Sequence, residues 1–472
     1  MAERLATLVG LYALLGLGYQ IVFGQLRALN LAQGALFGVG AYATALTAEQ
    51  IGPFALLVAP LAAGAVAALA APPMLRLQSH YFALATLALA SLINLVALHA
   101  EGLTGGANGL VGFGVALPRG TTLAIVVWLV LIAAVIAYAF VFRGAMGEKA
   151  RLLREAPLVA ATLGIDGALW RFTAFVVGGA VAGLAGGFSA ALTGVVSPEA
   201  TGFSVMLLCL TAVVLGGARH PLGAVLGAAV AVLLPELFRG LQGSWLLAYA
   251  AATLAVVLWA PEGLAGLFTR PRAATLPRPI APAARPLHLV LTGVSKRFGG
   301  VEALGDVSFA VERSEVVGLI GPNGSGKTTL LNVISGLERA DSGTIVLDSI
   351  GLEHLPPHAI ARLGIGRTFQ TPIEGESRGA GLARAVSNGA AFLLLDEPAA
   401  GMTDRERDAL AHWLERLRRT RGIVLVDHDI ELLTRVCDRL VCLEGGRIIA
   451  VGSPAEVRAD PRVRASFLGV PA

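Results

Sequence analysis

Cysteine is rare in this 472-residue chain, which has three such residues, Cys209, Cys437 and Cys442. Their spacing matches no metal-binding pattern, and three cysteines are too few to indicate a disulfide framework. The sequence therefore argues against a disulfide-stapled secreted domain. It favours a reducing compartment, the cytosol, for the part of the chain that carries Cys437 and Cys442.

Charge is also scarce, but only in the first part of the chain. Charged residues make up 14% of the sequence, and hydrophobic residues make up 55%. Residues 1–270 hold 21 charged side chains, whereas the shorter stretch 289–472 holds 44. This contrast is typical of a membrane domain followed by a globular one. The basic excess lies in residues 1–288, so the net charge of +4 does not indicate a nucleic-acid partner.

Long apolar segments predict a polytopic α-helical membrane domain of about 8–10 transmembrane helices. Several segments reach the ~20 residues that a spanning helix needs, and Gly or Pro interrupts the shorter ones. The first has no clear cleavage site and leads into further hydrophobic segments, so it is interpreted as a membrane helix and not as a removed signal. Nine segments precede residue 261: 5–24, 33–48, 54–72, 81–100, 121–142, 170–193, 203–218, 221–238 and 244–260.

Two stretches near these segments are rich in positive charge, residues 143–171 and residues 270–285. The positive-inside rule predicts that both face the cytoplasm. Four apolar segments lie between them, and an even number is what a shared side requires. With five spanning segments before residue 143, the N-terminus would lie outside.

Polar and small residues inside the segments have a packing interpretation. Glycines spaced four apart, at 179, 183 and 187 and at 223 and 227, predict close approach of helices in lipid. Glu236 lies near the end of its segment beside Arg239, which favours a paired or interfacial carboxylate over a substrate ligand. The polar residues within the segments are Gln20, Asn30, Gln33, Asn94 and Glu236.

Residues 271–288 read PRAATLPRPIAPAARPLH, and their five prolines predict an extended, semi-rigid linker. Residues 289–472 then alternate β-rich and helical runs, which predicts an α/β domain. Strands are expected near 289–292, 307–311, 315–320, 344–348, 391–395, 422–426 and 439–444, and helices near 327–336, 357–363, 404–420 and 429–436.

A P-loop stands at the centre of this domain. The string GPNGSGKTT at 321–329 fits G-x-x-x-x-G-K-T, with an apolar run before it and a helical pattern after it. Glycine N–H groups and a helix N-terminus would cradle a polyphosphate, with Lys327 on the β- and γ-phosphates and Thr328 on Mg²⁺. The candidate phosphate-binding residues are Gly321, Asn323, Gly324, Ser325, Gly326, Lys327, Thr328 and Thr329.

Other residues complete a nucleotide site. A buried strand at 392–395 ends in Asp396, a candidate Mg²⁺ ligand through water, and Glu397, a candidate general base for the attacking water. His428 follows a second apolar strand and suits a contact with the γ-phosphate. Gln370 offers a side chain that can reach Mg²⁺ and water, and Phe298 offers a ring for adenine stacking.

Residues 289–472 resemble an ATP-binding-cassette (ABC) ATPase, specifically the ATP-binding subunit of branched-chain amino-acid importers. The shared strings are VSKRFGGVEAL, GPNGSGKTTLLNVISGL, GIGRTFQ, LLLDEPAAGM, VDHDIELL and GGRIIAVGSPAEVRADPRV. The resemblance implies a Q-loop at Gln370, Walker B at Asp396, the base at Glu397, a D-loop at 400–404 and the switch at His428. It also implies ATP and Mg²⁺ as cofactors.

Residues 1–266 resemble the permease subunit of the same importers. The shared strings are LAQGALFGVGAYATAL, YFALATLALA, LTGGANGL, REAPLVAATLGID, VVSPEA, VVLGGARHPLGAVLGA and WAPEGLAGL. The resemblance implies that residues 154–166 form the coupling helix that docks onto an ATPase. The expected domains are thus a permease at 1–270, a linker at 271–288 and an ATP-binding domain at 289–472.

The chain departs from the ATPase family at one place. Only 25 residues separate Gln370 from Asp396, and no LSGGQ-like signature occurs there. The family carries a helical subdomain and that signature in this interval, and each ATP in its dimers lies between the P-loop of one subunit and the signature of the other. The sequence therefore leaves it open whether the chain hydrolyses ATP without a partner.

Three functions are consistent with these patterns. The first is ATP-driven import of branched-chain or related hydrophobic amino acids across the bacterial inner membrane, by a multi-pass subunit whose ATPase domain is cytoplasmic. The second is an ATP-binding, catalytically deficient scaffold that depends on a partner ATPase. The third, an exporter fusion, conflicts with the permease strings and the compact 143–171 loop. The resemblance implies a second permease, a second ABC ATPase, an extracytoplasmic substrate-binding protein, membrane lipid and a small amino-acid substrate as partners.

Overall fold

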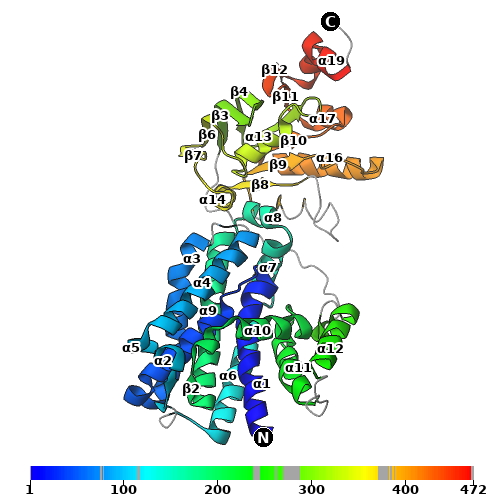
Figure 1. The fold of residues 1–472 in the computed structure, drawn as a ribbon. Coiled ribbons are helices and arrows are strands. Elements are labelled where there is room, and N and C mark those ends of the chain that lie inside the picture. Colours follow the sequence, from blue (N-terminus) through cyan, green and yellow to red (C-terminus); the bar gives the residue numbers. More distant parts are fainter. Residues whose placement is uncertain are drawn as a thin grey trace. The chain divides into compact units, whose positions relative to one another are not determined.

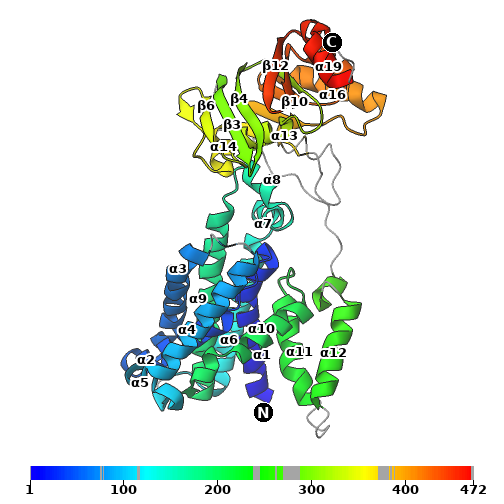
Figure 2. The same cartoon turned by 45° about the horizontal axis from the view of Figure 1, so that its top comes forward.

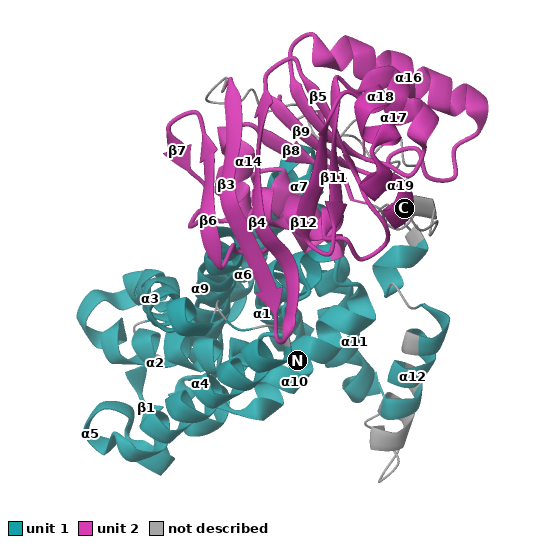
Figure 3. Ribbon diagram, turned by 90° about the horizontal axis from the view of Figure 1, so that it is seen from above, with its two compact units in different colours: residues 1–154, 168–273 teal, residues 155–167, 274–472 magenta. Residues whose placement is uncertain are grey.

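The computed structural model forms two compact units (Figure 3). Unit 1 comprises Met1–Arg154 and Ala168–Ala273, and unit 2 comprises Glu155–Gly167 and Ala274–Ala472. The structure describes residues 2–74, 77, 79–113, 117–237, 245–260, 263–268, 287–369, 382, 385–386, 389–390 and 391–468. Nearly all of the linker predicted at 271–288 lies outside the described residues.

Unit 1 is a bundle of apolar helices (Figure 1). Among the described residues, five stretches are long and apolar enough to cross a membrane: Ala2–Gly24, Gln33–Met74, His80–His99, Gly120–Val141 and Gly167–Thr193. The second of them is two helices joined by a 3₁₀ turn, Gly52–Phe54, and these helices pack on each other. The principal helices are α1 Ala2–Tyr19, α2 Gln33–Ile51, α3 Ala55–Met74, α4 Ser79–His99, α6 Gly120–Val141, α7 Ala145–Glu155, α9 Gly167–Thr193, α10 Phe203–Gly216, α11 Gly223–Leu237 and α12 Trp245–Trp259.

Each of the nine predicted apolar segments overlaps one of these helices. Short elements connect them, and the first segment ends in a five-residue π-helix, Gln20–Gly24. The short elements of unit 1 are η1 Gln20–Gly24, η2 Gly52–Phe54, α5 Glu101–Thr104, η3 Gly106–Asn108, β1 Leu110–Val111, β2 Val195–Val196, η5 Pro198–Thr201 and η7 Leu264–Phe268.

Glycines and amide side chains hold unit 1 together. A Cβ built at Gly183 would lie 2.4 Å from Ala63 Cβ, so only glycine permits this approach of α9 to α3. Gln20 Nε2 donates to Gly217 O at 2.9 Å, and Gln33 Nε2 donates to Gly178 O at 3.0 Å. The packing interpretation of the glycines is thus confirmed, and these two amides satisfy carbonyls of other segments.

Unit 2 contains two sheets that follow from its β-rich runs. A mixed six-stranded sheet has the order β12-β11-β5-β10-β9-β8, and an antiparallel sheet has the order β4-β3-β6-β7. Strands β3, β4 and β6 of the second sheet lie side by side in Figure 2. The strands are β3 His288–Phe298, β4 Val301–Glu312, β5 Val316–Ile320, β6 Ser342–Leu347, β7 Ile350–Gly351, β8 Ile365–Arg367, β9 Phe392–Asp396, β10 Gly422–Val426, β11 Arg439–Glu444 and β12 Arg447–Gly452.

Strands β5, β9 and β10 are buried at every position, because they pair in parallel and are covered on both faces. One core contains α13 and residues of both sheets, and a second contains α16 and α17 with the opposite face of the larger sheet. The helices are α8 Pro157–Thr162, α13 Lys327–Ile334, α14 Pro357–Leu363, α16 Asp404–Arg418, α17 Ile430–Val436, α18 Pro454–Ala459 and α19 Pro461–Leu468. All seven predicted strands and four predicted helices are present, whereas β7, β8, β12, α18 and α19 were not anticipated.

Candidate nucleotide-binding site

The P-loop lies between β5 and α13, as the sequence predicts. Gly324 and Gly326 have φ angles of 81° and 100°, in the left-handed region that favours glycine. A Cβ at Gly326 would approach Ala303 O to 2.5 Å, whereas a Cβ at Gly324 would meet nothing within 4 Å. The loop is therefore packed against β4 on one side and open on the other, where a phosphate chain has room.

Lys327 begins α13 and folds its side chain over the loop. Its Nζ donates to Gly321 O at 2.7 Å and to Pro322 O at 2.9 Å. Burial lowers the pKa of Lys327, and the negative charges of Glu397 and Asp396 oppose that shift. A cation in this place, beside the glycine-rich turn at the start of α13, is suited to bind phosphate.

Asp396 ends β9 and is 3% exposed. Burial raises its pKa, and the guanidinium of Arg367 is the largest opposing effect. Its backbone N–H donates to Thr368 Oγ1 at 3.0 Å, the Thr328 side chain interacts with its carboxylate, and Oδ1 makes no hydrogen bond of normal geometry. A buried carboxylate oxygen without such a hydrogen bond is a fitting ligand for a hard divalent cation, directly or through water.

Glu397 and His428 meet across neighbouring strand ends. His428 Nε2 lies 3.0 Å from Glu397 Oε1, and Glu397 N–H donates to Val426 O at 2.8 Å. Glu397 has a φ of 47°, which for a non-glycine residue costs about 1–3 kcal/mol and is common at functional sites. The structure thus brings together the predicted base and the predicted switch.

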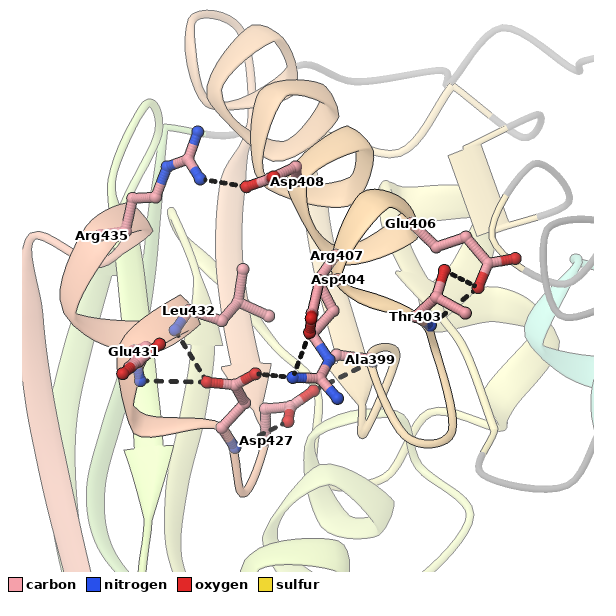
Figure 4. A network of polar contacts seen from close by, with 11 residues as sticks. Ala399, Thr403, Asp404, Glu406, Arg407, Asp408, Asp427, Glu431, Leu432 and Arg435 are labelled. Atoms are coloured by element: carbon pink, nitrogen blue, oxygen red, sulfur yellow. Dashed lines mark hydrogen bonds and ion pairs between the residues drawn. The ribbon is translucent and has the colours of Figure 1, made fainter.

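A polar network ties the loops that carry these two residues (Figure 4). Asp427 Oδ2 accepts from Ala399 N at 3.0 Å, and its Oδ1 accepts from Asp429 N at 3.0 Å. Arg407, on α16, pairs at 3.4 Å with Asp429. Sequence reasoning missed Asp427 and Arg407, because their roles depend on the packing of α16 beside α17.

The remaining predicted site residues have different outcomes. Phe298 ends β3 with 45% of its surface exposed, and Lys296 Nζ lies 5.3 Å from its ring centroid. A ring with this exposure is available for stacking. Asn323, Ser325 and Thr329 lie in or next to the P-loop turn. Gln370 lies outside the described residues.

Residues 155–167 contact the ATPase part within unit 2, and helix α8 packs on α14 and β8. Arg362 Nε donates to Gly164 O at 2.9 Å, and His358 Nε2 lies 3.5 Å from Asp166 Oδ2. Helix α14 leads directly into β8, which ends three residues before Gln370. The predicted coupling segment therefore contacts the element next to the Q-loop position.

The fold and the site define a class: a membrane unit of apolar helices joined to a P-loop nucleotide-binding unit, as in ABC transporters. The family described as the permease component of branched-chain amino acid transport systems matches residues 1–260. The ABC transporter family matches residues 304–374, and the family of branched-chain amino acid ATP-binding cassette transporters matches residues 447–472. The chain belongs to the branched-chain amino acid permease family, here fused to an ABC ATP-binding domain.

Curated relatives agree with this assignment. The high-affinity branched-chain amino acid transport ATP-binding protein BraF of Pseudomonas aeruginosa is 29% identical over 253 residues, which cover 39% of this chain and 99% of BraF. The corresponding protein LivG of Escherichia coli K12 is 30% identical over 248 residues, covering 38% of this chain and 97% of LivG. A solved nucleotide-free ATP-binding cassette of an ABC transporter is 25% identical, covers 39% of this chain and 100% of that chain, and has a TM-score of 0.36. The chain is a membrane protein of an ABC branched-chain amino acid transport system, with a nucleotide-binding domain.

Proposed function

We propose that this chain is a fused permease and ATPase subunit that imports branched-chain or related hydrophobic amino acids across the inner membrane at the expense of ATP. The observation that carries the proposal is one chain with a permease-family unit and a nucleotide site in which Lys327, Asp396, Glu397 and His428 converge. Helix α8, which lies in the stretch that matches the permease family, packs on α14 of the ATPase fold within unit 2. The domains proposed are 1–270, 271–288 and 289–472.

Each residue of the site has a proposed role. The P-loop backbone and Lys327 bind the phosphates, and Phe298 stacks on the adenine. Mg²⁺, which neutralises phosphate charge in such sites, would be held by Thr328, Asp396 and Gln370. Glu397 accepts the proton of the attacking water, and His428 holds Glu397 and the γ-phosphate in line.

The proposed transporter contains three further proteins besides this chain. A second permease and a second ABC ATPase complete the transporter, and an extracytoplasmic binding protein delivers the amino acid. The ATPase domain lies in the cytoplasm, consistent with the basic stretch at 143–171 and with the buried, unpaired cysteines of unit 2.

Uptake of labelled leucine tests this proposal. Cells without their own leucine uptake, given the chain and its partners, should accumulate leucine, and Lys327→Ala should abolish accumulation at equal expression. Lys149→Ala, which removes a lysine of unit 1, is the matched control and should retain uptake. Leucine uptake that persists in Lys327→Ala cells would contradict an ATP-driven role for this chain.

A second candidate function is an ATP-binding scaffold that depends on a partner for catalysis. It is favoured by the 25-residue interval between Gln370 and Asp396, which has no signature string. The alignment with BraF runs over 253 residues, although 39% of this 472-residue chain is about 184 residues. The relative therefore carries about 70 residues that have no counterpart here, which supports a reduced ATPase domain. ATP binding without turnover in the purified chain would favour this function.

A further inference from the structure

Arg367 is a buried cation that faces the Asp396 carboxylate from the neighbouring strand. Both side chains are 2% exposed, and Arg367 Nη2 lies 3.6 Å from Asp396 Oδ2. Arg367 Nη1 donates to Ser335 Oγ at 2.8 Å, and this hydroxyl in turn donates to Leu331 O at 2.8 Å. The guanidinium is thus anchored between the end of β9 and the C-terminal end of α13.

This anchoring makes the two oxygens of Asp396 unequal. Oδ2 faces the guanidinium, whereas Oδ1 is buried and makes no hydrogen bond of normal geometry. Strands β8 and β9 pair in parallel, with Arg367 opposite Leu394, and Thr368 Oγ1 accepts the N–H of Asp396. Groups of β8 and the residue after it therefore hold both the backbone and one carboxylate oxygen of Asp396.

We propose that Arg367 is the positioning residue for the metal-binding carboxylate of the nucleotide site. It holds Asp396 Oδ2 and thereby leaves Oδ1 directed to the divalent cation that accompanies the nucleotide at Thr328. The inference rests on the proposed function, in which the site binds ATP with Mg²⁺.

Arginine is suited to this task because its planar fork spans two partners at once. A lysine would keep the charge but has one nitrogen, which cannot hold Ser335 and Asp396 together in this geometry. Without a cation at this position, the buried carboxylate would be left uncompensated. It would then turn toward Lys327, the other cation whose charge acts on it, and would leave the metal position.

The test compares nucleotide binding with and without a divalent cation. The full-length chain in detergent is titrated with a fluorescent ATP analogue in Mg²⁺ and in EDTA. Arg367→Gln should reduce the gain in affinity that Mg²⁺ gives by at least about tenfold, because a charge-assisted contact is lost, and should leave binding in EDTA nearly unchanged. Arg367→Lys should fall between Arg367→Gln and the wild type. Electron paramagnetic resonance of Mn²⁺ with nucleotide reports the bound metal directly and should show the same order.

Arg439→Gln is the matched control. Arg439 lies on β11 of the same sheet, and its Nε is 2.6 Å from Glu315 Oε1. The substitution therefore removes a similar ion pair at a place away from Asp396. It should lower stability without altering the preference for Mg²⁺. Ser335→Ala, which removes only the second anchor of Arg367, should shift the preference in the same direction by less.

The outcomes separate this inference from the proposed function. An unchanged Mg²⁺ preference in Arg367→Gln, or equal losses in Mg²⁺ and in EDTA, would overturn the positioning role alone. Should Arg367→Gln fail to fold, the Mg²⁺ preferences of Arg367→Lys and Ser335→Ala are compared with that of the wild type. A reduced preference in both variants supports the positioning role, and an unchanged preference in both overturns it. No Mg²⁺ preference in the wild type would overturn the proposed nucleotide chemistry and, with it, this inference.

Discussion

Glu397 shows how one residue combines strain with function. Its left-handed backbone is unfavourable for a carboxylate side chain, yet its N–H is satisfied by Val426 O and its Oε1 lies 3.0 Å from His428. The contacts of β10 and of the loop after it thus hold Glu397 in place. The strained conformation is consistent with the proposed role of Glu397 as the reactive acid.

Lys327 should contribute most of the charge-assisted binding of nucleotide. Removing its contact to phosphate is expected to cost about 1.5–3 kcal/mol, since the partner is charged and partly desolvated. Lys327→Ala in the full-length chain should therefore weaken ATP binding by roughly 10- to 150-fold in isothermal titration. Lys149→Ala serves as the control, and equal affinities of both variants would refute the P-loop assignment.

At the scale of elements, the short helix α8 joins two parts of the sequence by packing on α14. It belongs to the permease family's stretch of sequence, yet it lies in the same compact unit as the ATPase fold. Gly164, just after α8, has a φ of 80°, and its carbonyl accepts from Arg362 on α14. Glycine is favoured there because this φ is unfavourable for other residues, and a Cβ would also lie 3.1 Å from Arg362 Cγ.

Gly164→Ala should therefore impair transport while leaving nucleotide binding intact. Any L-residue pays about 1–2 kcal/mol for this backbone conformation, and the added methyl group also presses on the α14 contact. Gly144→Ala isolates the second effect, because Gly144 has a φ of 74° and a Cβ there meets nothing within 4 Å. Leucine uptake and ATP affinity are measured for both variants. If uptake falls equally in the two, the docking contact is not what matters.

At the scale of the whole molecule, the chain has a P-loop but no LSGGQ-like string between Gln370 and Asp396. In ABC dimers the signature donates groups to the γ-phosphate across the interface, and loss of one such donor costs ~10²–10³ in rate. A homodimer of this chain would contain two incomplete sites. A heterodimer with a complete ATPase would contain one whole site, built from this chain's P-loop and the partner's signature.

We therefore expect negligible ATP hydrolysis by the purified chain alone. In a mixed complex, Glu397→Gln should abolish most turnover, while the same change in the partner should have little effect, because only one site is complete. Phosphate release from each complex is the measurement. Robust, cooperative turnover by the chain alone would mean that residues 371–390 supply the missing donors.

The membrane topology gives an independent test at the same scale. Met146 and Leu287 are exposed and are expected in the cytoplasm, whereas Leu103 lies one membrane segment earlier and is expected outside. In right-side-out vesicles, an impermeant maleimide should label Leu103→Cys but not Met146→Cys or Leu287→Cys. The three native cysteines are buried and give little background. Labelling of Met146→Cys from outside would show that the positive-inside prediction is wrong.

The sequence alone determined the type and order of the main elements. Apolar runs, period-two and helical patterns and the P-loop string are local signals, so they marked nine apolar helices, the principal strands and residues such as Lys327, Asp396 and Glu397. Short strands without a clear pattern escaped it, and β8, of three residues, is the main example.

The tertiary structure alone decided which of these pieces meet. The order β5-β10-β9-β8 does not follow the chain, so nothing local in the sequence placed Arg367 beside Asp396 or Asp427 beside Ala399. Likewise, Gly164 and Arg362 are 198 positions apart and meet because α8 packs on α14. Strand pairing and helix packing depend on the burial of whole apolar faces. Local sequence patterns do not distinguish between several possible partners of a strand or helix, and burial in the folded chain selects one of them.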